Sequence, residues 1–310
     1  MRVLSIGECM AELAPAGAPK TYRLGFAGDT YNTAWYLARL GVAVDYLTSV
    51  GDDPISGRMV AAMEAAGVGT RWVEALPGAT VGLYLITLAE GERSFAYWRG
   101  QAAARRLAED GDRLARAMAE ADLVYLSGIT LAILPPDGRD RLLDALGAAR
   151  ARGARVAFDP NLRPRLWSGA DEMTETVMRA AARADIALPS HEDEAAWFGD
   201  GSCAATAARY AEAGAQVVAV KDGAAPVHWR DGTASGTVAP EPVAQVVDST
   251  AAGDSFNAGL LAGLADGLPL PRAVARGCRL SAQVVQGRGA LVEVEPQRQP
   301  SRGAPPTCRT

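Results

Sequence analysis

Cysteine, histidine and lysine are all scarce in this chain of 310 residues. The four cysteines (Cys9, Cys203, Cys278 and Cys308) form no CxxC pair, and the two histidines have no metal-ligand spacing. These spacings argue against a zinc cluster and against a disulfide framework, and they favour a reducing cytoplasm. The chain has 29 arginines but only two lysines, Lys20 and Lys221, so a lysine inside a motif is notable.

Long hydrophobic runs and an excess of positive charge are also missing. The longest apolar stretch, residues 123–134, is far shorter than the roughly 20 residues of a membrane-spanning helix. Glu8 and Glu12 do not fit the apolar region of a signal peptide. The net charge of -5 argues against nucleic-acid binding. We therefore expect a cytoplasmic protein whose partners include neither membrane nor nucleic acid.

Three common motifs are absent as well. Without GxxxxGK[ST] the chain is not a P-loop kinase, and without GxGxxG a Rossmann dehydrogenase is disfavoured. The nucleophile elbow GxSxG of hydrolases is missing too. Any nucleotide site must therefore be built in another way.

What the chain does contain is an alternation of helical patterns and short apolar strands. Helices are predicted at 138–152, 172–183 and 204–213, and strands follow them at 156–158, 186–188 and 217–220. This order indicates βαβ units and an α/β fold with a mostly parallel sheet. Such sheets bind ligands beyond the carboxyl ends of their strands. The segments to inspect there are Gly128, 159–163, 190–194 and 221–223.

Two segments interrupt this alternation. Residues 8–26 have an irregular pattern containing prolines. Residues 80–99 alternate with period two and predict a hairpin of strands 81–88 and 93–99, with a turn at Glu90-Gly91. We expect these two regions to form a small β lid on one domain spanning residues 1–296. The Pro- and Arg-rich residues 297–310 are predicted to be a flexible tail.

The strongest motif is Asp248-Ser-Thr-Ala-Ala-Gly-Asp254, which precedes a helical pattern. The small residues Ala251, Ala252 and Gly253 would let backbone amides approach an anion at the positive end of the helix. Asp254 beside them could accept a hydroxyl proton, which is the arrangement that phosphoryl transfer to an alcohol requires. The helix dipole should keep Asp254 ionised and therefore weakly basic. A simple helix cap explains the motif alone equally well.

A second motif lies near the start of the chain, at residues 26–34. Gly28 precedes a predicted helix and would let a ligand approach the backbone, while Asp29 and Asn32 offer polar groups. Taken alone the motif is weak, because an acid before a helix is usually a cap.

Together the two motifs resemble the signatures of the ribokinase (PfkB) carbohydrate kinase family, in the same order and more than 200 residues apart. The resemblance covers about residues 1–295. It implies a ribokinase-like three-layer α/β sandwich with a small β lid, and ATP and Mg²⁺ as cofactors. It implies that Asp254 is the catalytic base and that Ala251, Ala252 and Gly253 form the anion hole. By analogy with the paired lids of this family, it also implies a homo-oligomer.

Several further segments resemble the 2-keto-3-deoxygluconate kinases within this family. They are Gly28-Asp29-Thr30, Tyr97-Trp98-Arg99 and Asp159-Pro-Asn-Leu-Arg-Pro164. The implied reaction is transfer of the ATP γ-phosphate to the C6 hydroxyl of 2-keto-3-deoxygluconate. Arginine suits a sugar acid because its planar fork pairs with a carboxylate. The residues implied to hold the sugar acid are Gly28, Asp29, Asn32, Tyr84, Tyr97, Arg99 and Arg163.

The resemblance also implies a nucleotide site. Asn161, Arg163, Lys221, Gly223 and Gly253 would lie near the ATP phosphates. Many relatives carry Asn-x-x-Glu after a sheet strand to support magnesium, whereas here Ser190 and Asp193 stand at those positions. Because Mg²⁺ prefers oxygen ligands and keeps several waters, Asp193 could still act through water.

Alternative interpretations remain at this point. Arg99 and Arg163 could form surface ion pairs, and Tyr97 and Trp98 could be ordinary hairpin packing. The chain could phosphorylate a neutral sugar such as fructose or ribose, in which case Arg99→Ala would leave activity largely intact. It could also be a non-catalytic sugar-binding protein on the same scaffold, although Asp254 argues against that.

Overall fold

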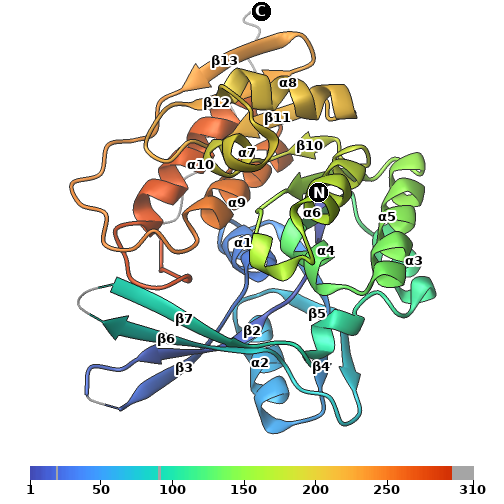
Figure 1. Ribbon diagram of the computed structural model, residues 1–310, viewed down its shortest axis with the longest axis vertical. Helices are drawn as coiled ribbons and strands as arrows, with labels where there is room; N and C mark the ends of the chain where they lie inside the picture. The colour runs from blue at the N-terminus through green and yellow to red at the C-terminus, as the bar shows by residue number, and fades with distance from the viewer. Residues whose placement is uncertain (19, 90–91, 295–310) are drawn as a thin grey trace, which may run out of the picture.

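The computed structural model describes residues 1–18, 20–89 and 92–294. Within these residues a nine-stranded sheet forms the centre of the molecule (Figure 1). Its strands, in spatial order, are β13 (Ala234–Val238), β12 (Val227–Asp231), β11 (Val217–Val220), β10 (Ile186–Ala187), β9 (Arg155–Asp159), β8 (Leu123–Ser127), β1 (Arg2–Ile6), β4 (Ala43–Gly51) and β5 (Gly69–Leu76).

The pairing from β11 across to β5 is parallel, and only β12 and β13 at one edge are antiparallel. Short apolar strands such as Val217–Val220, buried at every residue, are typical of a sheet covered on both faces. In β1, Val3 packs into one hydrophobic cluster, whereas Leu4 and Ile6 pack into the other.

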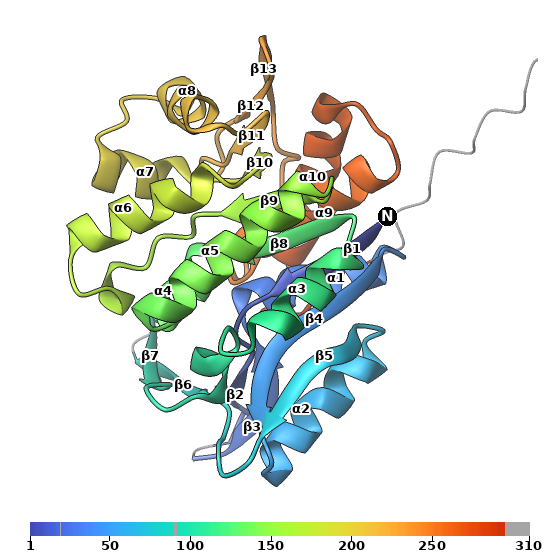
Figure 2. The ribbon, with the colours of Figure 1, turned by 90° about the vertical axis from the view of Figure 1, so that its right-hand side faces the viewer.

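Helices cover both faces and complete three layers (Figure 2). The α/β three-layer fold predicted from the sequence is therefore confirmed. One face carries α1 (Asp29–Arg39), α2 (Pro54–Ala65), α9 (Ala252–Ala265) and α10 (Leu270–Val284). The other carries α3 (Gly111–Ala119), α4 (Gly128–Ile133), α5 (Pro136–Ala151) and α6 (Ala170–Ala181). Near the antiparallel edge lie α7 (His191–Phe198) and α8 (Cys203–Ala213), and the 3-10 turns are η1 (Ala103–Arg106) and η2 (Pro164–Leu166).

A separate four-stranded sheet projects from the body (Figure 1). Its order is β3 (Tyr22–Ala27), β2 (Met10–Pro15), β6 (Leu83–Ala89) and β7 (Glu92–Trp98). The predicted hairpin is confirmed as β6 and β7, although its turn at 90–91 lies outside the described residues. The expectation that residues 8–26 are irregular was wrong. Residues 10–15 pair antiparallel with 22–27, and Pro15 is tolerated because it ends its strand.

The small sheet starts directly where β1 ends, which places it at the carboxyl edge of the large sheet. A small apolar cluster joins it to the body, where Met10, Tyr84 and Ile86 pack against Ala290. Among the described residues no helix is both long enough and apolar enough to cross a membrane. The predicted tail at 297–310 and Cys308 lie outside the described residues.

Candidate active site

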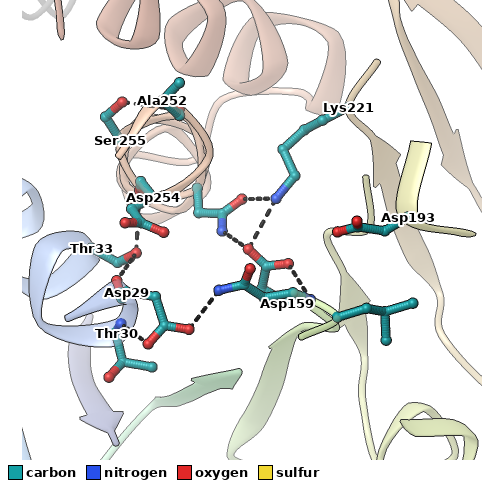
Figure 3. A network of polar contacts seen from close by, with 12 residues as sticks. Asp29, Thr30, Thr33, Asp159, Asp193, Lys221, Ala252, Asp254 and Ser255 are labelled. Atoms are coloured by element: carbon teal, nitrogen blue, oxygen red, sulfur yellow. Dashed lines mark hydrogen bonds and ion pairs between the residues drawn. The ribbon is translucent and has the colours of Figure 1, made fainter. Parts of the chain in front are cut away.

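Four chain segments meet at the carboxyl edge of the sheet (Figure 3). They are the start of α1, the end of β9, the end of β11 and the start of α9, and hydrogen bonds link all four. Neither acid that begins a helix here is the N-cap residue. The caps of α1 and α9 are Gly28 and Ala251, without side-chain cap bonds. The capping interpretation therefore fails for Asp254, whereas Asp29 Oδ1 accepts the first-turn amide of Thr30 at 2.8 Å.

Asp159, the last residue of β9, is the centre of the network. Its Oδ2 accepts hydrogen bonds from Lys221 Nζ at 3.0 Å and from Asn257 Nδ2 at 2.6 Å. Lys221 Nζ also donates to Asn257 Oδ1 at 3.2 Å. Because Asp159 is only 4% exposed, these donors replace the water that its charge has lost.

Asn161 connects this centre to α1. Its backbone has a φ of 36°, a left-handed conformation that asparagine tolerates better than most residues. Its N–H donates to Asp159 Oδ1 at 3.1 Å, and its Nδ2 donates to Asp29 Oδ2 at 2.7 Å. Asn161 thus bridges the carboxylates of Asp159 and Asp29, so its side-chain amide is already hydrogen-bonded within the network.

Asn32 and Thr33 hold the predicted base. Asn32 Nδ2 donates to Asp254 Oδ2 at 2.8 Å, and Thr33 Oγ1 donates to the Asp254 carbonyl at 3.2 Å. These bonds join the two sequence motifs across more than 200 residues. Asn32 was expected to hold the sugar, and here its amide orients Asp254.

The electrostatics of Asp254 overturn one expectation. Burial, together with the nearby carboxylates of Asp29 and Asp159, raises the pKa of Asp254 to about 8, although Asn32 and Lys221 act in the opposite direction. A helix terminus contributes only about 0.3–1 kcal/mol, whereas one pKa unit corresponds to about 1.4 kcal/mol. The dipole therefore does not keep this carboxyl weakly basic, and its proton affinity suits a general base near neutral pH.

We expect this pKa to govern the acid side of the pH profile. Since the base must be deprotonated, kcat/KM should rise with pH through the range near 8 instead of levelling off above pH 5. Asp29→Asn removes a neighbouring negative charge, so the midpoint should move to lower pH. Initial rates between pH 5.5 and 9.5 measure both curves. An Asp29→Asn midpoint equal to or above that of the wild type would contradict this account.

The start of α9 does not offer every backbone amide that the sequence predicted for binding an anion. Ala251 adopts a left-handed φ of 60°, and the Ala252 amide donates to the Ser249 carbonyl at 3.1 Å. The Ala252 amide is thus already used within the turn. Gly253 and Asp254 follow in the first turn, whose amides have no acceptor inside the helix. A Cβ on Gly253 would lie 3.6 Å from Lys221 Nζ, so the lysine faces this helix start.

Glycine is required at position 28 because the backbone of Glu8 passes close to it. Its φ of 177° is ordinary, but a Cβ at this position would overlap the carbonyl oxygen of Glu8. We expect Gly28→Ala to displace α1, with a loss of about 1–3 kcal/mol in the free energy of unfolding and a lower kcat. Gly57→Ala in α2 is the control, because its Cβ would meet open space and alanine favours a helix. Urea unfolding and initial rates of both variants test this, and equal stability and activity of Gly28→Ala and the wild type would contradict it.

The lid side chains have partners of their own. Tyr84 is buried and donates to Glu12 Oε2, and burial with the Glu12 charge raises the pKa of Tyr84. Tyr97 is exposed and stacks on Phe95 with ring centroids 6.2 Å apart. Arg99 forms a buried ion pair with Glu8. Arg99 therefore does form an ion pair, as one alternative interpretation expected, but the pair is buried and not at the surface.

The remaining predicted residues lie outside the hydrogen-bonded network. Arg163 is half-exposed and forms a loose ion pair with Asp193, with Nη1 and Oδ2 3.7 Å apart. Asp193 lies on the far side of Asp159 from Asp254 in Figure 3. Burial raises its pKa. Gly223, at a φ of 53°, is a turn residue with nothing near its Cβ position.

Sequence reasoning gave no role to three residues that the structure places in or beside the site. Asp159 ends β9 within a segment singled out for inspection, and Asn257 lies one helical turn after Asp254, on the same face of α9. Asp248 Oδ2 accepts from the Gly289 amide at 2.6 Å and so anchors the loop before α9. Nothing in the local sequence around 289 indicates this last contact.

The fold and these contacts define an α/β enzyme that transfers a phosphoryl group to an alcohol. Residues 1–297 match the pfkB family carbohydrate kinases, and the chain belongs to this family. It is 41% identical to a 2-dehydro-3-deoxygluconokinase of Dickeya dadantii over 94% of this chain and 96% of that protein. It is 37% identical to the 2-dehydro-3-deoxygluconokinase of Haemophilus influenzae, with the same coverage.

Solved structures support the fold. The crystal structure of a fructokinase with bound ATP from Xylella fastidiosa superimposes with a TM-score of 0.82. It is 27% identical and covers 93% of each chain. The chain is thus a sugar kinase of the pfkB family.

Proposed function

We propose that the chain is a 2-dehydro-3-deoxygluconokinase that phosphorylates the C6 hydroxyl of 2-keto-3-deoxygluconate, the same compound, with ATP. Two relatives of this name match 94% of the chain at 37–41% identity, whereas the fructokinase structure is 27% identical. The single structural observation that carries the kinase chemistry is the 2.8 Å bond from Asn32 to Asp254, because it brings both motifs to one reacting centre.

The reaction proceeds as a single displacement. The sugar C6 oxygen forms a bond to the γ-phosphorus, the bond from that phosphorus to the bridging oxygen of ADP breaks, and the hydroxyl proton passes to Asp254. The amides of Gly253 and Asp254, with Lys221 Nζ beside them, stabilise the charge on the transferring group. Because the transition state is loose, positioning by Asn32 and Thr33 contributes as much as basicity does.

The residues of this site could bind magnesium only together with the phosphates of the nucleotide. Among residues 1–18, 20–89 and 92–294 no cluster of three or more His, Cys, Asp or Glu could hold a metal ion. Mg²⁺ commonly binds through one or two carboxylates, several waters and the substrate phosphates. Asp193, beside Arg163 and outside the hydrogen-bonded network, would hold it through water, and the ion would neutralise phosphate charge.

Arginine contacts distinguish a sugar acid from a neutral sugar. Arg99→Ala is an ambiguous test, because it also leaves the buried Glu8 carboxylate without its partner. Arg163 is half-exposed; its Nη1 donates to the Leu162 carbonyl at 2.7 Å and lies 3.7 Å from Asp193 Oδ2. Its alanine variant removes a charged hydrogen bond to the sugar acid, worth about 1.5–3 kcal/mol, and leaves the partly exposed Asp193 without this ion pair.

We expect Arg163→Ala to lower kcat/KM for 2-keto-3-deoxygluconate about 10- to 100-fold. Arg165→Ala, two residues away and equally exposed, is the matched control and should retain wild-type values. The measurement is a coupled ADP-release assay across sugar acids, fructose and ribose. Faster turnover of a free hexose or of ribose than of every sugar acid would replace this proposal with a neutral-sugar kinase.

The same proposal covers assembly and location. We place the enzyme in the cytoplasm, where its co-substrate ATP is abundant, and treat residues 1–296 as one kinase domain. Tyr97 and Trp98 are exposed side chains on one lid strand, which supports a homo-oligomer joined through the lids. Equilibrium sedimentation of the wild type and of Trp98→Ser tests that assembly.

A further inference from the structure

Glu8 and Arg99 form a buried ion pair between the lid and the body. Glu8 follows β1, and Arg99 follows the lid strand β7. Arg99 Nη2 donates to Glu8 Oε2, and the two side chains are 14% and 1% exposed. Ion pairs buried to this degree require further hydrogen bonds to offset the loss of hydration.

Those further bonds are missing on both sides. Within the part of the chain that the structure describes, Glu8 Oε1 and Arg99 Nε are buried polar atoms with no hydrogen-bond partner. Gly82 packs closely against Glu8 Oε1, since a Cβ there would lie 2.8 Å from that oxygen. An arginine has five donors, so one contact with Glu8 leaves capacity for a second carboxylate.

The pair also adjoins the segment proposed to hold the sugar. The Glu8 carbonyl lies against Gly28, and the Asp29 carboxylate on α1 acts on Glu8 electrostatically. Arg105 of η1 is the other nearby cation. The remaining titratable neighbours, Cys9 and Tyr46 of β4, are neutral, because burial raises the pKa of each. Counted in their ionised forms, Glu8 and Asp29 balance Arg99 and Arg105 before any sugar acid binds.

We propose that Glu8 takes up a proton from solvent when the carboxylate of the sugar acid binds at Arg99, which makes substrate binding proton-linked. This inference rests on the proposed function, since it requires an acidic substrate. The only bond formed is O–H on the Glu8 carboxyl. The formal charge of the site is then the same before and after the sugar acid binds.

Glu8 is the group suited to accept this proton. An arriving carboxylate adds one uncompensated negative charge to a buried site, where opposite charges are poorly screened. Desolvation raises the pKa of Glu8, although Arg99 opposes that shift. Burial raises the pKa of Asp29 too, but both of its oxygens accept hydrogen bonds, from Asn161 and from Thr30, which favour its ionised form.

The expected sign follows from linkage. Because a proton enters with the sugar acid, binding weakens as pH rises, and Kd should increase towards tenfold per pH unit once Glu8 is ionised in the free enzyme. A glutamine at this position can neither lose nor gain a proton there. Glu8→Gln should therefore bind the sugar acid with a Kd that depends less steeply on pH than that of the wild type, and the dependence that remains should come from Asp254, whose pKa is about 8.

The experiment is titration calorimetry of 2-keto-3-deoxygluconate into the full-length enzyme without ATP, at pH 6.5–8.5, in two buffers that differ in ionisation enthalpy. The difference in heat between the buffers gives the number of protons taken up. We expect the wild type to take up more protons per sugar than Glu8→Gln, with a difference that approaches one proton. Glu109→Gln, an exposed glutamate after η1, is the control and should match the wild type.

Each outcome decides the question. Binding and turnover of the sugar acid without proton uptake by the wild type would overturn this inference and leave the proposed function standing. Equal uptake by Glu8→Gln and the wild type would overturn it as well. If the wild type neither binds nor phosphorylates the sugar acid, both proposals fail. Should Glu8→Gln not fold, the uptake of Asp254→Asn decides instead, because this variant keeps Glu8: retained uptake supports the inference, and loss of the uptake would assign the proton to Asp254 and overturn it.

Discussion

Asp254→Asn is expected to fold like the wild type and to lose about 10²- to 10⁴-fold in kcat, the usual contribution of a general base. Asparagine keeps the shape of the side chain, and its amide oxygen can still accept the bond from Asn32. The variant lacks the carboxylate that takes the C6 hydroxyl proton. The residual rate should come from positioning and from the amides at the start of α9.

The same substitution should leave stability unchanged or increased. In the wild type, burial and the charges of Asp29 and Asp159 oppose ionisation of Asp254. A neutral asparagine removes that repulsion, so the melting temperature should not fall at pH 8. Asp171→Asn, in the first turn of α6, controls for the loss of an acid at a helix start. A near wild-type kcat for Asp254→Asn would refute its assignment as the base.

Lys221→Met is expected to lower the free energy of unfolding by about 3–5 kcal/mol, because it leaves a buried carboxylate without its cation. Lys221 and Asp159 are 13% and 5% exposed, so water cannot replace the lost contact easily. The lysine also stands beside the helix start that would hold the transferring phosphate, so kcat should fall too. Urea unfolding with matched initial rates measures both effects.

The chain supplies its own control for this experiment. Lys20→Met removes the only other lysine, which is exposed, and should change neither stability nor rate. The double variant Asp159→Asn with Lys221→Met should regain part of the lost stability, since no buried charge remains unpaired, while its activity stays low. Unfolding of Lys221→Met at the wild-type urea midpoint would show that the Asp159 contact is energetically unimportant.

Local patterns in the sequence predicted much of the fold. The apolar strands at 156–158 and 217–220 and the helices between them follow from period and length, and both appear within a few residues of the expected bounds. Residues 8–26 were harder, because a hairpin with a proline at a strand end shows only a weak alternation. Strand order across the sheet depends on contacts distant in sequence, and only the structure gave it.

Candidate residues were predicted more reliably than their partners. The sequence alone singled out Asp254, Asn32, Asn161 and Lys221. In the structure, all four belong to one hydrogen-bonded network. Their partners were not foreseeable. Arg99 pairs with Glu8 across 91 positions, and Asp159 binds Asn257 across 98. A motif specifies which groups are present, but it does not specify which of them satisfy one another.

The sequence by itself determined the α/β class, the chemistry available at residues 251–254 and the family to which these motifs point. Only the tertiary structure decided that Asp254 is basic near neutral pH, that the Ala252 amide is already used, and that Glu8 holds Arg99. The physical reason is that secondary structure depends on periodicity over neighbouring residues, whereas burial and charge interactions depend on distance in space. The pKa of Asp254 rises only after folding has buried its carboxyl and brought it close to those of Asp29 and Asp159.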